Sequence, residues 1–421
     1  MSRPLSMNGV EASIPMNKLR CLMLYVVAAL VVVGCKADPK PQNEAVPAPS
    51  AQKEETIRVG LIATLTGKYS AMGSEDKKAV ELAVEQVNEK GGLLGKKVTL
   101  LTRDDQTMPD KSVLAYNELK TENVVAVIGS VFSNSALAVE PLAERDGMPY
   151  VSLTPADEQV QPIKPYVFVV PALSGAFAER YLDYMQSQKI QKIAIAHDTK
   201  GAYAVSGYNA MKTLASKYGV QIVKDEEFET STSDFSAIFT HIKGSGAQAF
   251  VFWGSGPPGV TVTKQYAAAK IKIPLFMTAA QASKLWLEPV GPAGEGVTVV
   301  SSIGVVGDYL PDGPQKQIIE QMAAPYRTKH GYPPPQFAQD GYSGALLLFE
   351  AINVAGGTNR EKVQQALEHM TLLTPNGKFK YSPSDHSGLS SEFIAVSTVQ
   401  GGKFVPTDWA KEKLARTVAS P

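Results

Sequence analysis

The stretch that decides the fold is IRVGLIATLTGKYSAMGSEDKKAVELAVEQVNEKGGLLGKKVTLLTRDDQ, residues 57–106. Its first part, Ile57–Ala63, is a short run of β-branched and aliphatic residues that indicates a strand. From Ser74 onward apolar residues recur at helical spacing, so we predict a helix with Ser74 as its N-cap. A glycine pair ends this helix, and a second strand follows at Lys97–Leu101. Such a βαβ unit predicts a parallel sheet, with a candidate binding edge at the loop Thr64–Gly73.

Length and charge limit the class of protein. The chain has 421 residues, enough for two or three domains of roughly 100–200 residues each. Lys plus Arg and Asp plus Glu number 41 each, so the formal net charge is zero. A nucleic-acid-binding protein needs a basic face or stripe, and we therefore expect no nucleic-acid partner. The hydrophobic fraction of 44% is ordinary for a soluble globular chain.

The N-terminal segment has the pattern of an export signal. A basic stretch at 17–20 precedes the apolar run Cys21–Val33, which is too short to span a bilayer but suits a signal peptide. The run leads to Val-Val-Gly-Cys at Cys35, which resembles a bacterial lipobox, in which the cysteine carries lipid. An ordinary secretory signal with an incidental cysteine is the alternative.

We predict a signal peptide over residues 1–34, with Met16 as an alternative start, and a lipidated flexible tether over 35–55. The tether is rich in Pro, Ala and charged residues, a composition that does not form a packed core. The folded part is then expected to be exported and held by lipid at a membrane surface, which is the periplasm in a two-membrane bacterium.

The rest of the chain alternates strands and helices in two blocks. Up to Asp157 the order strand, loop, helix is repeated three times, and each strand leads into a loop with small hydroxylated residues. After a crossing at Pro171 the same rhythm begins again, which predicts two similar lobes. Two of the later helices are predicted at Gln315–His330 and Ser343–Ala355.

Several sequence blocks in fixed order resemble the leucine/isoleucine/valine-binding proteins, the substrate-binding subunits of bacterial branched-chain amino acid ABC importers. Besides residues 57–106, these blocks are VIGSVFSNSALAV, GMPYVSLTPAD and KIAIAHDTKGAYAVSGY. The resemblance implies a type I periplasmic binding fold: an α/β structure of two doubly wound parallel-sheet lobes, joined by a three-segment hinge that closes over the ligand. It places lobe 1 at 56–171 plus 303–388, lobe 2 at 172–302 plus 389–409, and a C-terminal tail at 410–421.

The resemblance also implies where a ligand carboxylate binds. In the family, the serine loop after the VIG strand holds it with hydroxyls and backbone N–H groups, and Ser133 and Ser135 occupy the matching positions. Capping of the following helix is the alternative role for Ser135. Thr154 and Ala156 follow the next strand, where relatives use a backbone carbonyl and a small hydroxylated residue.

The second half of the implied site departs from the family pattern. Tyr203 matches a cleft tyrosine of lobe 2, whereas Met72 stands where relatives have another tyrosine. Ala280 replaces the glutamate that binds the ligand ammonium group, and Gln281 beside it is a weaker, neutral acceptor. The ligand is therefore expected to be either an amino acid or an aliphatic or aromatic acid without an ammonium group.

Motifs for catalysis and cofactors are absent from the sequence. Residues 254–259 match G-x-G-x-x-G, but two prolines remove amides that would face a pyrophosphate. There is no P-loop and no G-x-S-x-G, and the five histidines lack metal-ligand spacing. We expect no enzyme activity, cofactor or metal, but a monomeric subunit that presents a small carboxylate-bearing ligand to an ABC permease and ATPase. A ligand-sensing subunit that signals to a membrane receptor or regulator is the alternative, because the fold serves both.

Overall fold

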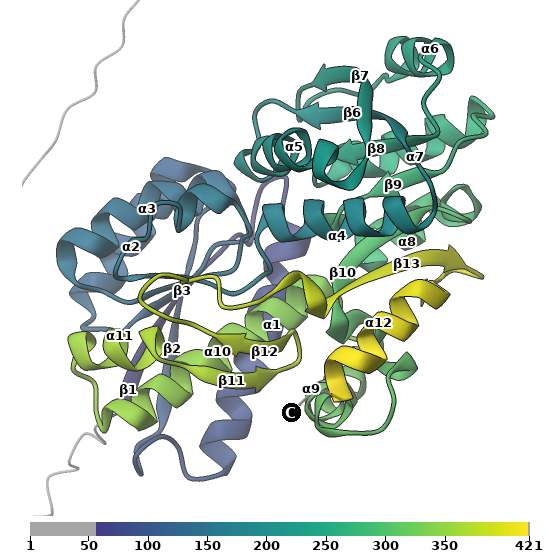
Figure 1. The fold of residues 1–421 in the computed structure, drawn as a ribbon. Helices are drawn as coiled ribbons and strands as arrows, with labels where there is room; N and C mark the ends of the chain where they lie inside the picture. Colours follow the sequence, from purple (N-terminus) through teal and green to yellow (C-terminus); the bar gives the residue numbers. More distant parts are fainter. Residues whose placement is uncertain (1–55, 420–421) are drawn as a thin grey trace, which may run out of the picture. The chain divides into compact units, whose positions relative to one another are not determined.

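The computed structural model describes residues 56–419. The predicted signal peptide, Cys35 and the tether lie outside the described residues. Within 56–419, no helix combines the length and the apolar character that a membrane crossing requires. This part of the chain forms two α/β lobes, one on each side of a central connection (Figure 1).

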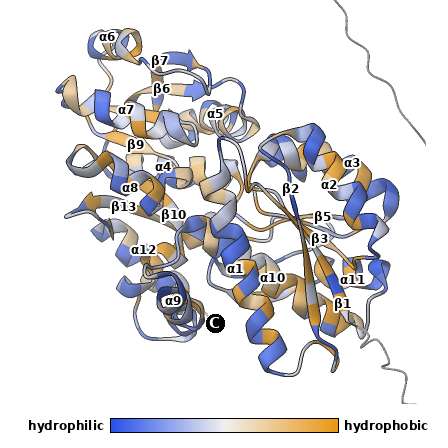
Figure 2. Ribbon diagram, turned by 180° about the vertical axis from the view of Figure 1, so that it is seen from behind, coloured by the Kyte–Doolittle hydropathy of each residue, from blue (hydrophilic) through white to orange (hydrophobic). Residues whose placement is uncertain are grey.

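Lobe 1 is built on a five-stranded parallel sheet with the order β2-β1-β3-β4-β5. Its strands are β1 (Ile57–Ala63), β2 (Val98–Asp104), β3 (Val127–Gly129), β4 (Tyr150–Ser152) and β5 (Val167–Val169). One face packs against α1 (Ser70–Glu89), α10 (Gln336–Ala355) and α11 (Arg360–Glu368). The other face packs against α2 (Pro109–Thr121) and α3 (Ser133–Asp146). Hydrophobic residues concentrate on these strands and on the helix sides that face them (Figure 2).

Lobe 2 contains a seven-stranded sheet with the order β14-β13-β10-β9-β8-β6-β7. Five strands are parallel: β6 (Lys192–Asp198), β7 (Gln221–Phe228), β8 (Ala249–Trp253), β9 (Leu275–Met277) and β10 (Thr298–Ser302). The edge strands β13 (Ile394–Gln400) and β14 (Lys403–Pro406) are antiparallel. The helices before α9 are α4 (Ser174–Ser187), α5 (Ala202–Leu214), α6 (Ser236–Gly244), α7 (Pro257–Ala268) and α8 (Lys284–Val290). The predicted α/β fold with parallel-sheet lobes is confirmed, and the antiparallel edge is an addition to it.

Three segments connect the lobes. The first leads from β5 through Pro171 into α4, and the second follows β10 at Ser302 and continues to α9 (Pro314–His330) and α10. The third passes Gly388 on its way from the hairpin β11 (Thr371–Thr374) and β12 (Gly377–Lys380) to β13. Three crossings of this kind let two rigid lobes change their relative orientation by small backbone rotations.

Two predicted helix starts are wrong, because both helices begin earlier in the chain than we predicted. Helix α1 begins at Ser70, and Ser74 lies inside it, where its hydroxyl donates a 2.7 Å hydrogen bond to the Ser70 carbonyl. Ser74 therefore bonds back to the preceding turn from inside the helix, and it is not the N-cap. Helix α10 begins at Gln336, seven residues before the predicted Ser343. Both added turns carry residues that lie at the cleft.

The predicted C-terminal tail is a helix over most of its length. Helix α12 (Asp408–Ala419) buries Ala410 and Leu414 against lobe 2. Beside it, the guanidinium carbon of the buried Arg180 lies 4.6 Å from the centroid of the Trp409 ring. An amphipathic face and a cation–π contact therefore hold most of the predicted tail against lobe 2.

Candidate functional site

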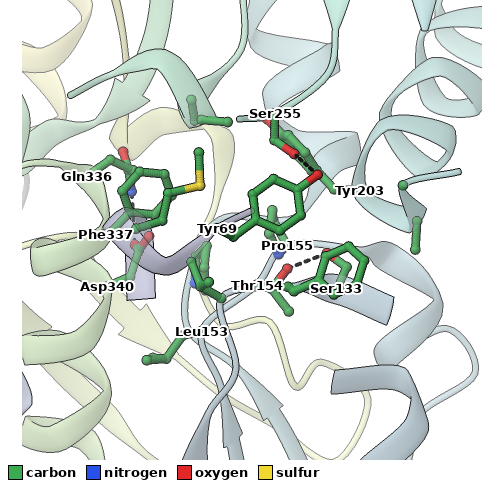
Figure 3. A pocket seen from close by; sticks show the side chains of 18 of the residues that line it. Tyr69, Ser133, Leu153, Thr154, Pro155, Tyr203, Ser255, Gln336, Phe337 and Asp340 are labelled. Atoms are coloured by element: carbon green, nitrogen blue, oxygen red, sulfur yellow. Dashed lines mark hydrogen bonds between the residues drawn. The ribbon is translucent and has the colours of Figure 1, made fainter. Parts of the chain in front are cut away.

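A small cavity lies between the two lobes. Lobe 1 contributes Met72 of α1, Ser133 of α3 and Thr154 after β4, and lobe 2 contributes Tyr203 of α5 and the chain at Ala280 (Figure 3). Its volume, counted as the space open to the centres of water molecules, is about 50 Å³. Its position at the carboxyl ends of parallel strands is where such sheets bind small ligands.

Two hydroxyl groups form the polar side of the cavity. Ser133 is the first residue of α3, and its Oγ is hydrogen-bonded to Oγ1 of Thr154. Both side chains are almost completely buried. The first backbone N–H groups of a helix have no partner inside the helix, and no side chain caps α3. Hydroxyls and free amides at the positive end of a helix dipole favour an anion.

Four of the sequence-predicted site residues therefore meet at one cavity: Met72, Ser133, Thr154 and Tyr203. The Tyr203 hydroxyl is buried and makes no hydrogen bond within residues 56–419. Burial raises the pKa of Tyr203 above its ordinary value, so this hydroxyl remains a neutral donor. A buried donor without a partner is costly, and a ligand in the cavity can supply the missing acceptor.

The other three predicted residues lie elsewhere. Ser135 is fully buried and does not line the cavity. It lies inside the first turn of α3 and is therefore not the N-cap either. The Ala156 carbonyl accepts a 3.0 Å hydrogen bond from the side-chain amide of Gln159. Gln281 uses its amide locally: Nε2 donates to the Gly254 carbonyl at 3.2 Å, and Oε1 accepts from Thr278 at 3.0 Å. Their roles in ligand binding stay predictions.

The first turns of α10 supply cavity residues that the sequence reasoning missed. Gln336, Phe337 and Asp340 all line the cavity, and Asp340 is 3% exposed (Figure 3). Oδ1 of Asp340 accepts hydrogen bonds from Gln336 Nε2 at 2.9 Å and from Asn376 Nδ2 at 2.7 Å. Burial raises the pKa of Asp340 to about 8, although the two hydrogen bonds act in the opposite direction. No sequence pattern marked these three residues, because they precede the apolar run from Ala345 that indicated the helix.

Direct contacts hold the two lobes together beside the cavity. The Ser255 hydroxyl of lobe 2 donates to the Tyr69 hydroxyl of lobe 1 at 3.3 Å. Asn134 of lobe 1 donates through Nδ2 to the Lys200 carbonyl at 3.1 Å and accepts from the Ala202 N–H at 3.0 Å. These contacts join side chains of one lobe to the other, so the structure shows the lobes closed on each other.

Two α/β lobes that close on a small polar-and-aromatic cavity define a binding protein with a hinged cleft. The chain belongs to the periplasmic binding protein family, which matches residues 56–403. A similar protein is Leu/Ile/Val-binding protein homolog 3 of Brucella melitensis, 27% identical over 354 residues, covering 83% of this chain and 93% of that one.

Solved structures have the same fold. An extracellular ligand-binding receptor from Rhodopseudomonas palustris HaA2 aligns with a TM-score of 0.78 at 20% identity, covering 84% of this chain and 100% of that one. A solute-binding protein of an ABC transporter from R. palustris, solved in complex with benzoate, aligns with a TM-score of 0.74 at 23% identity, covering 84% and 95%. By name, all three relatives are binding proteins for small ligands.

Proposed function

We propose that this chain is the extracytoplasmic solute-binding subunit of an ABC importer, and that it captures a small carboxylate-bearing ligand by closure of the two lobes. The observation that carries the proposal is the Ser133–Thr154 hydroxyl pair at the start of α3, inside a cavity that both lobes enclose. The ligands for which these relatives are named or with which they were solved, branched-chain amino acids and benzoate, have a carboxylate in common. A carboxylate is therefore the group that we expect the cavity to recognise in its ligand.

The chemistry of capture follows from the cavity wall. A carboxylate that reaches Ser133 and Thr154 replaces their mutual hydrogen bond, since each hydroxyl can instead donate to one carboxylate oxygen. The remaining wall is largely apolar, with Met72, Phe177 and Phe337 among its members. These side chains bury the ligand's hydrocarbon part, and each methylene removed from water contributes roughly 0.8 kcal/mol.

The test is a binding measurement with one variant and one matched control. A thermal-shift screen of amino acids, aliphatic acids and aromatic acids identifies the ligand, and calorimetry gives its affinity. Ser133→Ala is expected to weaken that affinity about 10- to 100-fold, because a hydrogen bond to a charged group contributes roughly 1.5–3 kcal/mol. Ser112→Ala removes a buried hydroxyl on α2 that does not line the cavity, and it is expected to leave the affinity unchanged. Equal affinity of Ser133→Ala and the unaltered protein would remove this serine from the site.

Export and lipid attachment at Cys35 are part of the proposal. The sequence pattern before Cys35 supports them, as does membership of a periplasmic binding protein family. Expressed with its signal, the chain is expected to sediment with membranes, and Cys35→Ser is expected to release it into the soluble fraction. A chain that stays soluble with Cys35 intact would contradict the anchor while leaving the binding proposal untouched.

A further inference from the structure

One end of the cavity carries the carboxyl group of Asp340, although Ala280 leaves the site without the glutamate that the family resemblance implied. Asp340 lies on the cavity wall, and both of its hydrogen bonds end on Oδ1. Oδ2 accepts no hydrogen bond from any residue within 56–419 and remains free for a ligand. In Figure 3, Asp340 and Gln336 stand on one side of the cavity and the Ser133–Thr154 pair on the other, with Tyr69 between them in the view.

A second buried carboxyl group, that of Asp76, lies next to this end of the cavity. Asp76 of α1 is 2% exposed, and neither of its carboxyl oxygens has a hydrogen-bond partner among the described residues. Helices α1 and α10 pack closely here: a Cβ added at Gly341 would lie 2.6 Å from the Asp76 carbonyl oxygen. Burial and the neighbouring Asp340 and Glu75 raise the pKa of Asp76 well above its usual range. Each of these two carboxyl groups thus makes the other harder to ionise.

The third carboxylate of this region already has its partners. Glu75 accepts hydrogen bonds from the hydroxyls of Tyr326 and Tyr332, and Lys78 Nζ lies 2.8 Å from its Oε1. No cation is placed in the same way beside Asp340 or Asp76 within the described residues. Nor does any group of three His, Cys, Asp or Glu side chains in 56–419 have the arrangement of a metal site. The carboxyl groups of Asp340 and Asp76 therefore have no cationic partner among the described residues, and a ligand cation would favour the ionised form of Asp340.

We propose that Asp340 binds a cationic nitrogen of the ligand, so that the cavity selects a zwitterion with its amino group set apart from its carboxylate. The inference rests on the proposed function, in which the Ser133–Thr154 pair holds the carboxylate. A charge-assisted bond to Oδ2 supplies what Ala280 cannot, and it comes from lobe 1, on the side of the cavity away from the Ser133–Thr154 pair. The charged groups of an α-amino acid are on adjacent carbon atoms, whereas those of an ω-amino acid are separated by the hydrocarbon that the apolar wall covers.

Asp340 must lose its proton to bind an ammonium group, so the affinity for such a ligand depends on pH. The ionisable groups that interact with Asp340 are Asp76 of α1, which has Glu75 beside it, and Tyr203 of α5. The direct partners of Asp340, Gln336 and Asn376, are neutral. Because the pKa of Asp340 is raised to about 8, the empty site holds a proton at pH 7. An ammonium group binds the ionised carboxylate, so its affinity rises with pH from 6 to 8. An acid without the amino group has no such gain.

The experiment is calorimetry with matched ligand pairs: ω-amino acids of three to five carbons against the same acids without the amino group, and leucine against 4-methylpentanoate. In the unaltered protein, the best ω-amino acid is expected to bind at least about tenfold more tightly than its partner acid and more tightly than leucine. Asp340→Asn keeps the shape and the acceptor oxygen, and is expected to abolish this preference while the partner acid binds as before. Glu350→Gln removes a charge ten residues further along α10, about 15 Å away, and serves as the control.

The outcomes separate the two proposals. If acids bind and respond to Ser133→Ala, but the amino and des-amino partners bind equally, only the role of Asp340 is overturned. A preference that survives Asp340→Asn, or leucine binding more tightly than every ω-amino acid, overturns it as well. If no acid binds and Ser133→Ala changes nothing, the proposed function itself fails. The pH profile of the unaltered protein needs no variant, and a flat profile for the amino ligand counts against Asp340 even if Asp340→Asn does not fold.

Discussion

Replacing Gly73 by alanine is expected to destabilise the protein by on the order of 3 kcal/mol or more, or to prevent folding. A Cβ at this position would lie 2.2 Å from the Thr64 carbonyl oxygen and 2.8 Å from both the carbonyl carbon and the nitrogen of Thr64. All three are backbone atoms, so no change of side-chain rotamer relieves the clash. Helix α1 would have to move away from the end of β1, and both its N-cap residue Tyr69 and Met72 in its first turn line the cavity.

Urea unfolding measures the loss of stability, and calorimetry with the ligand from the screen measures the effect on the site. Gly244→Ala is the matched control, because a Cβ there meets nothing within 4 Å and the residue is the last of α6. Its stability is expected to stay equal or to rise by up to about 1 kcal/mol, since alanine is the better helix former. If Gly73→Ala unfolds at the same urea concentration as this control, α1 does not depend on the contact with Thr64.

The opening βαβ unit shows how much of the fold the sequence could predict. Strands β1 and β2 pair in parallel, and the helical repeat that begins at Ala79 is indeed the buried side of α1. The helix start was not predictable in the same way. The first turn, from Ser70 to Gly73, has only one strongly apolar residue, Met72, and its position depends on close packing against the chain at Thr64. Periodicity predicts a helix only where its apolar face is long enough to repeat.

In the candidate site, too, some residues could be predicted from the sequence and others could not. Ser133, Thr154 and Tyr203 were accessible because each follows a recognisable strand in a block that resembles the family, and the structure places all three on the cavity. Asp340 was not accessible, since it precedes the apolar run at Ala345–Leu348 that made the helix predictable. Its neighbours in space are about 260 residues away on α1, and only the tertiary structure brings them together. The sequence showed that a glutamate was missing, but not that an acid on the other lobe faces the same cavity.

Replacing Asp340 by asparagine is expected to stabilise the ligand-free protein, and by more at pH 8 than at pH 5. The pKa of Asp340 is raised to about 8 in the folded protein, whereas an unfolded aspartate ionises near about 4. Between these values the unfolded chain has lost a proton that the folded protein keeps, so the free energy of unfolding falls as pH rises, by up to about 1.4 kcal/mol per pH unit. Above about pH 8 both states are ionised and the loss is constant. Asparagine avoids this cost while its carbonyl oxygen can still accept from Gln336 and Asn376.

The stability difference between Asp340→Asn and the unaltered protein is therefore expected to widen from pH 5 to pH 8 and then level off, as measured by urea unfolding in steps of one pH unit. Asp76 titrates in both proteins, so most of its contribution cancels in the difference. Glu350→Gln, on the same helix, is the reference for the loss of one negative charge. A difference that does not change with pH would mean that Asp340 ionises normally in the folded protein. A widening difference would mean that the protein gives up stability to keep a carboxyl group on the cavity wall, as binding sites often do when the compensating charge arrives with the ligand.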